Sequence, residues 1–124
     1  MSDQVNNPPH YTNAAGKIEP IDFCRVFPFC FGNFCKYVIR APFKGAEAQD
    51  LRKAAKYLEW SKGELYRITK TLNAYSHLAK CFDNRWLNMV FTDHNYAYNF
   101  DLTVKCLLAY ADALEQTNEG RENI

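Results

Sequence analysis

Four polar side chains between residues 33 and 40 have types and a spacing that suit the binding of an anion. Asn33, Lys36, Tyr37 and Arg40 recur at i, i+3, i+4 and i+7, so that a helix would carry them along one face. An arginine grips a phosphate bidentately, whereas a lysine acts as a point charge. The pattern also has a purely structural explanation, in which Asn33 caps a helix, Tyr37 belongs to the core and Arg40 complements a helix dipole.

The distribution of charge favours a compact anionic ligand. The net charge is only +1, which excludes the broad basic surface of a protein that coats nucleic acid, so we expect no nucleic-acid partner. The charges are uneven, because residues 36–70 hold nine Lys/Arg against four Asp/Glu, and residues 82–124 hold three against seven. The sequence has neither a G-x-x-x-x-G-K-[ST] loop nor a G-x-G-x-x-G motif, so side chains and helix ends would have to hold a nucleotide.

Two pairs of carboxylates suggest a different chemistry. Glu19 and Asp22 are followed along the chain by Glu47 and Asp50, which have the same spacing. On two helices these four side chains suit Mg²⁺, in an arrangement similar to all-α nucleotide pyrophosphohydrolases of the MazG type. Acidic residues in the first turn of a helix also complement its dipole, which explains the same positions without a metal.

The five cysteines predict free thiols rather than a metal centre or a disulfide framework. Their number is odd and no two have a C-x-x-C spacing, so we assign no metal to them. No apolar run approaches the ~18 residues of a membrane span, and the N-terminus does not resemble a signal peptide. We therefore expect a cytoplasmic protein with no membrane partner.

The periodicity of the apolar residues predicts one all-α domain over residues 1–124, a small helical bundle with an extended N-terminal arm. No stretch alternates as a half-buried strand does, and the prolines of the arm exclude a helix there. Because Pro42 disfavours helical geometry at Ala41, a helix should end at Arg40. The expected helices cover residues 20–27, 31–40, 46–72 and 100–116, with a broken helix within 78–89.

The expected helix over residues 46–72 carries four leucines at seven-residue intervals, which are Leu51, Leu58, Leu65 and Leu72. If Gly63 does not break it, this helix is about 27 residues or ~40 Å long. Such a helix can pack against a second copy of the chain or within a single bundle. Together with the apolar content of residues 82–110, it favours a homo-oligomer.

Four ordered blocks between residues 5 and 58 resemble a bacteriophage family. They are V-N-N-P-P-H-Y-T over 5–12, I-E-P-I-D over 18–22, F-G-N-F-C-K-Y-V-I-R over 31–40 and D-L-R-K-A-A-K-Y-L over 50–58. The blocks are similar to the SaV-like group (domain of unknown function 3310), whose pattern is V-N-x-P-x-H-Y, I-E-x-I-D, G-N-x-x-K-Y-x-x-R and D-L-x-K-A-x-x-Y-L. Residues 60–124 resemble no family in this way.

This resemblance implies a phage origin, in the cytoplasm of an infected bacterial host, a homo-oligomer and a nucleotide ligand. The family includes a small nucleotide kinase without a Walker loop, so the resemblance also implies phosphoryl transfer to a nucleoside monophosphate. A protein that binds without turnover would instead sequester a nucleotide signal of host anti-phage defence. The polar positions of the family pattern fall on His10, Tyr11, Glu19, Asp22, Asn33, Lys36, Tyr37, Arg40, Asp50 and Lys53.

We therefore predict a nucleotide site where the N-terminal arm meets the helices over 31–40 and 46–72. On the arm, His10 and Tyr11 could close over a base or ribose, and His10 could relay a proton. The candidate catalytic residues are His10, Lys36 and Arg40, because phosphoryl transfer depends on positioning and on neutralising charge. The candidate nucleotide-binding residues are His10, Tyr11, Asn33, Lys36, Tyr37, Arg40 and Lys53.

Overall fold

The computed structural model describes residues 19–43 and 45–122, with the side chains of Ser76, His94 and residues 118–122 left out. Within these ranges every regular element is helical, which confirms the all-α prediction. None of the helices described there combines the length and the apolar character that crossing a membrane requires. The elements are α2 (Pro20–Cys24), α3 (Phe29–Arg40), η2 (Ala41–Phe43), α4 (Glu47–Ser61), η3 (Lys62–Glu64), α5 (Leu65–Ala79), η4 (Lys80–Phe82), α6 (Arg85–Phe91), η5 (Thr92–His94) and α7 (Tyr96–Glu122).

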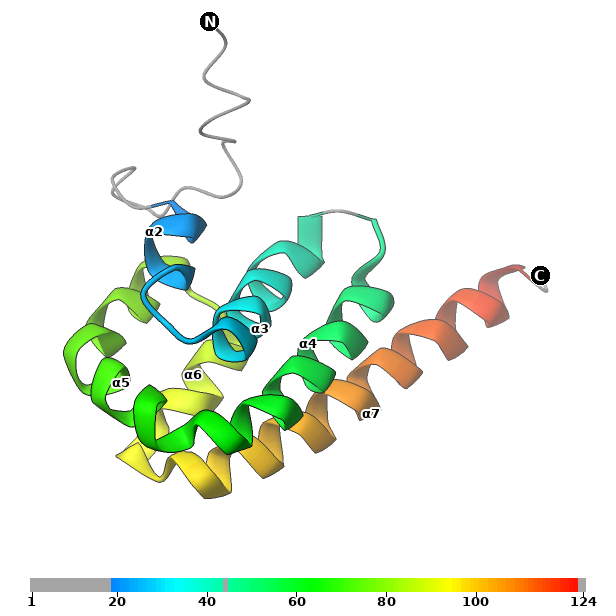
Figure 1. Ribbon diagram of the computed structural model, residues 1–124. Helices are drawn as coiled ribbons and strands as arrows, with labels where there is room; N and C mark the ends of the chain where they lie inside the picture. Colours follow the sequence, from blue (N-terminus) through cyan, green and yellow to red (C-terminus); the bar gives the residue numbers. More distant parts are fainter. Residues whose placement is uncertain (1–18, 44, 123–124) are drawn as a thin grey trace, which may run out of the picture.

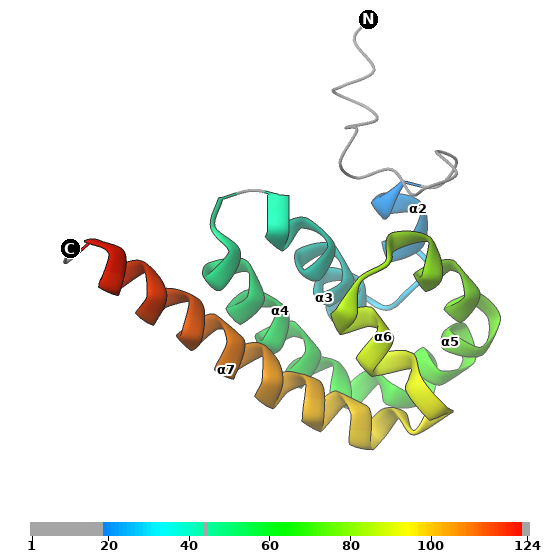
Figure 2. The same cartoon turned by 180° about the vertical axis from the view of Figure 1, so that it is seen from behind.

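Three helices, α3, α4 and α7, lie side by side and form the body of the molecule (Figures 1 and 2). Helix α4 is in the middle, and its contacts with α3 and α7 are the most extensive in the structure. Helix α3 buries five apolar side chains, all of them predicted from the helical period: Phe31, Phe34, Cys35, Val38 and Ile39. It ends at Arg40 as predicted and begins two residues earlier than expected. The local pattern therefore located the inner face of α3.

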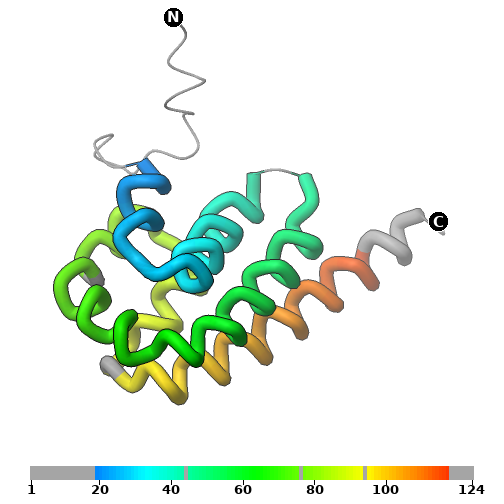
Figure 3. Tube along the Cα trace, viewed as in Figure 1, coloured from blue at the N-terminus to red at the C-terminus, as the bar shows by residue number. Residues whose placement is uncertain are grey.

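The prediction of one continuous helix over residues 46–72 is wrong. The 3₁₀ turn η3, which contains Gly63, separates α4 from α5, and α5 then runs in a new direction (Figure 3). This turn brings Leu58 of α4 and both Ile68 and Leu72 of α5 into one core, where all three are fully buried. Burial on two sides of a bend thus outweighs the regular leucine spacing, and the four leucines form no continuous seam.

Helix α7 exceeds its predicted range of 100–116 at both ends, and residues 78–89 contain the expected break. Near the start of α7, the buried amide of Asn99 donates to the carbonyls of Val90 at 3.0 Å and Thr92 at 2.5 Å. At the start of α6, Asn84 caps the helix and donates from Nδ2 to the carbonyl of Val38 at 2.9 Å. These two amides attach α7 to α6 and α6 to α3.

Part of the uneven charge is explained by the packing of α4 against α7. Arg52 forms ion pairs with Asp112, at 2.6 Å, and with Glu115. Lys62, just after α4, pairs with Asp101 of α7. Acidic residues of the C-terminal segment therefore neutralise basic residues along one side of α4. The lysines on its other side belong to a different surface, which α4 shares with α3.

Candidate functional site

Several predicted site residues lie around one aromatic ring between α3 and α4. The centroid of the half-buried Tyr37 ring is 5.3 Å from Lys36 Nζ, 5.0 Å from Arg40 Cζ and 5.6 Å from Lys53 Nζ. The face of an aromatic ring attracts cations at such distances. Asn33 lies one turn earlier on α3, and its Nδ2 donates to a carbonyl of the same helix at 2.9 Å. The structure thus brings Lys53 of α4 to the polar stripe of α3.

The guanidinium of Arg40 binds a carboxylate in the structure. Its Nε and Nη2 donate to the two carboxylate oxygens of Asp50, at 3.3 and 3.0 Å. Asp50 is 2% exposed, whereas the Arg40 side chain is 32% exposed. A buried carboxylate needs such a partner, because burial removes its hydration. Arg40 therefore joins the end of α3 to the start of α4, and this role is structural.

A group of aromatic residues that was not predicted from the sequence continues from Tyr37. The Tyr57 ring stacks on Tyr37 with the centroids 5.8 Å apart, and it meets Phe29 and Trp60 edge-on at 6.0 and 5.5 Å. Lys56 Nζ lies 5.5 Å from the Trp60 ring. The spacing of Lys53, Lys56, Tyr57 and Trp60 along one helix is the signal that could have found them. We call this region the α3–α4 surface, composed of Phe29, Asn33, Lys36, Tyr37, Arg40, Lys53, Lys56, Tyr57 and Trp60.

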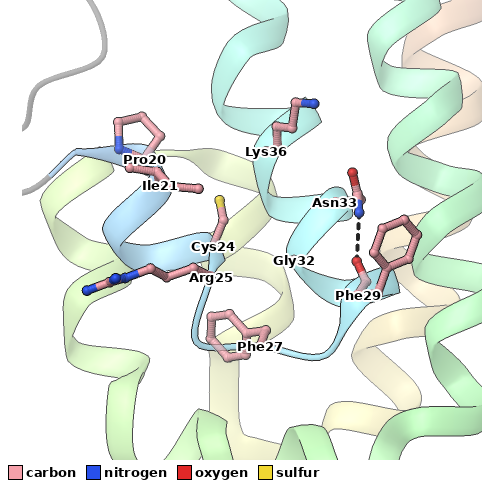
Figure 4. Close-up of a pocket in the computed structure, with 9 residues that line it drawn as sticks. All are labelled: Pro20, Ile21, Cys24, Arg25, Phe27, Phe29, Gly32, Asn33 and Lys36. Carbon is pink, nitrogen blue, oxygen red and sulfur yellow. Dashed lines mark hydrogen bonds between the residues drawn. The ribbon is translucent and has the colours of Figure 1, made fainter. Parts of the chain in front are cut away.

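A pocket of about 430 Å³ adjoins the α3–α4 surface, between α2 and the first turns of α3 (Figure 4). This volume is within the range of small-molecule sites. Asn33 and Lys36 line the pocket and also belong to the surface, so the two are continuous. On the α2 side, Arg25 contributes a cation that was not among the predicted site residues. The complete lining consists of Pro20, Ile21, Cys24, Arg25, Phe27, Phe29, Gly32, Asn33 and Lys36.

The thiol of Cys24 in this pocket is chemically quiet. Burial raises the pKa of Cys24 to about 12, although the nearby Lys36 opposes the shift. The thiol therefore stays neutral at physiological pH, and a neutral thiol is a poor nucleophile. All five cysteines are free, as the sequence predicts. The pocket contributes apolar surface and the cations at its edges rather than a covalent group.

The shape of the pocket depends on a close approach at Gly32. A Cβ atom on this residue would lie 2.8 Å from the carbonyl oxygen of Cys24, which belongs to the backbone of α2. We expect Gly32→Ala to lower the free energy of unfolding by about 1–3 kcal/mol, because α2 must move away from α3. Gly63→Ala is the matched control, since nothing lies within 4 Å of its Cβ position. Urea denaturation of both variants should show a loss for Gly32→Ala alone; equal stabilities would contradict this role.

The four carboxylates of the alternative metal site have separate surroundings. The backbone N–H of Glu19 donates to Asp22 Oδ2 at 3.2 Å at the start of α2, which is a capping interaction. Glu47 lies in the first turn of α4, and Asp50 binds Arg40. Within residues 19–43 and 45–122, no three His, Cys, Asp or Glu side chains are grouped as a metal site requires. His10 and Tyr11 lie outside the described residues.

The fold and the site define a class: a small all-α protein in which a basic, aromatic pair of helices adjoins a pocket. Residues 5–59 match the model of a family described as a protein of unknown function (DUF3310). The match includes the four sequence blocks and supports the family-level resemblance over that part of the chain. Neither the comparison with curated proteins nor that with solved structures found a match.

Proposed function

We propose that the protein binds a nucleotide in the pocket and at the adjoining end of the α3–α4 surface, around Lys36 and Tyr37. The observation that carries the proposal is the position of Lys36, which both lines the pocket and lies 5.3 Å from the Tyr37 ring. A ligand with an apolar or aromatic part in the pocket would place its anionic part near Lys36, Arg40 and Lys53. A nucleotide combines these two parts. The resemblance to a phage family with a nucleotide kinase supports the same ligand class and a phage origin.

Replacing Lys36 by alanine tests this site. We expect the affinity for a nucleotide to fall about ten- to a hundredfold, because a charge-assisted contact contributes ~1.5–3 kcal/mol. Lys70→Ala is the matched control, since Lys70 Nζ also lies over a tyrosine ring, 4.9 Å from that of Tyr66, but neither residue lines the pocket or belongs to the α3–α4 surface. Calorimetric titration of both variants measures the difference. An unchanged affinity in Lys36→Ala would show that Lys36 does not contact the nucleotide and would contradict the proposed site.

Binding and turnover are separate questions for the same protein. Phosphoryl transfer needs a second nucleotide as phosphate donor and Mg²⁺, whereas sequestration needs neither. Incubation with a panel of nucleoside mono- and triphosphates, followed by chromatography, distinguishes a converted ligand from one that is released unchanged. We propose binding as the shared function, with kinase-like transfer and sequestration as its two forms. The proposed homo-oligomer is independent of this, and it no longer has the support of a continuous leucine helix.

A further inference from the structure

The α3–α4 surface extends beyond the three of its residues, Phe29, Asn33 and Lys36, that line the pocket. Beyond Tyr37, the rings of Tyr57, Phe29 and Trp60 form an unbroken group with centroid distances of 5.5–6.0 Å. Phe29 is 71% exposed and Trp60 is 55% exposed, although large apolar side chains are more often buried, as five of the nine phenylalanines are here. The exposed rings lie at the end of the surface away from the Arg40–Asp50 pair.

The three lysines of this surface differ from Arg52 of α4 and from Lys62, which directly follows α4. Arg52 and Lys62 form ion pairs with acidic residues of α7. In contrast, Lys36, Lys53 and Lys56 form no ion pair within the part of the chain that the structure describes, and each lies over an aromatic ring. Exposed rings combined with unneutralised lysines form a surface on which bases stack and phosphates are neutralised.

We propose that this surface binds a ligand with at least two nucleobases joined by a phosphodiester. The proposal rests on nucleotide binding at the same site and extends it: the pocket and Tyr37 take one nucleotide, and the Tyr57–Trp60 end takes a second base. Lys53 and Lys56, one turn apart on α4, lie beside the linking phosphate. A net charge of +1 is sufficient for so short a ligand, although it does not suit the coating of long nucleic acid.

The experiment compares ligands of increasing size on the full chain. The probes are a 5′-mononucleotide, the linear and the cyclic dinucleotide of the same base, a six-nucleotide single strand and its duplex. Trp60 is a built-in reporter, since the only other tryptophan, Trp86, is 6% exposed. We expect the dinucleotides and the single strand to quench Trp60 fluorescence and to bind about tenfold or more tightly than the mononucleotide, because stacking of a second base adds affinity. Whichever of the linear and the cyclic dinucleotide binds more tightly shows whether the site suits a linear or a cyclic ligand.

Trp60→Ala should lower the affinity for the two-base ligands about tenfold and leave the affinity for the mononucleotide within about twofold. Tyr66→Ala, which removes an even more exposed ring (76% against 55%) with its own lysine, should change neither affinity. Equal binding of mononucleotide and dinucleotide, or of duplex and single strand, would overturn this inference but leave nucleotide binding intact. If no nucleotide of any size binds, both proposals fail.

Discussion

Replacing Arg40 by alanine should lower the free energy of unfolding by about 2–4 kcal/mol, because the change leaves the buried carboxylate of Asp50 without its bidentate partner. Urea denaturation followed by circular dichroism measures the loss. Asp50→Asn should cost less, since Arg40 is one-third exposed and can turn toward water. A stability of Arg40→Ala equal to that of the original chain would show that the pair contributes nothing.

A double-mutant cycle isolates the interaction between the two side chains. Because the two residues are in direct contact, the loss in Arg40→Ala/Asp50→Asn should be clearly smaller than the sum of the single losses. Arg40→Lys adds a second measurement, since a lysine cannot reproduce the planar fork. If Arg40 also holds phosphate, Arg40→Lys should weaken nucleotide binding at temperatures where the variant is fully folded. If its role is only structural, the affinity should stay unchanged.

Replacing Phe31 by alanine should lower the free energy of unfolding by about 3–5 kcal/mol, which is the usual range for emptying a core phenylalanine site. Phe31 is fully buried and stacks on Phe100 of α7, with the ring centroids 5.5 Å apart. It also meets Phe27, which lines the pocket, edge-on at 4.8 Å. The same denaturation measurement applies, and a loss below about 1 kcal/mol would contradict a rigid packing role.

Phe29→Ala is the control for this change, because Phe29 lies on the same helix but is mostly exposed. Its loss should stay within about 0.5–1 kcal/mol. The pair also separates stability from ligand binding. Phe29→Ala should reduce the affinity for a two-base ligand while the protein stays folded, whereas Phe31→Ala should destabilise the protein whatever ligand is present.

The sequence by itself determined the features that depend on neighbouring residues along the chain. The two faces of α3 follow from spacing alone, since residues three and four apart share a face whatever the rest of the fold does. The end of this helix at Arg40 follows from the steric effect of Pro42 on the residue before it. The capping of α2 by Glu19 and Asp22 is also local, with its partners three residues apart.

Only the tertiary structure decided the features that need contacts between distant segments. The bend at Gly63 formed because Leu58 and Leu72 bury together better in a folded-back chain than in a straight helix. The Arg40–Asp50 pair and the stacking of Tyr37 on Tyr57 required α3 and α4 to pack side by side. Periodicity gives the direction of a side chain relative to its own helix. The residue that this side chain contacts depends on how the whole core buries its apolar surface, and a local sequence pattern does not contain that information.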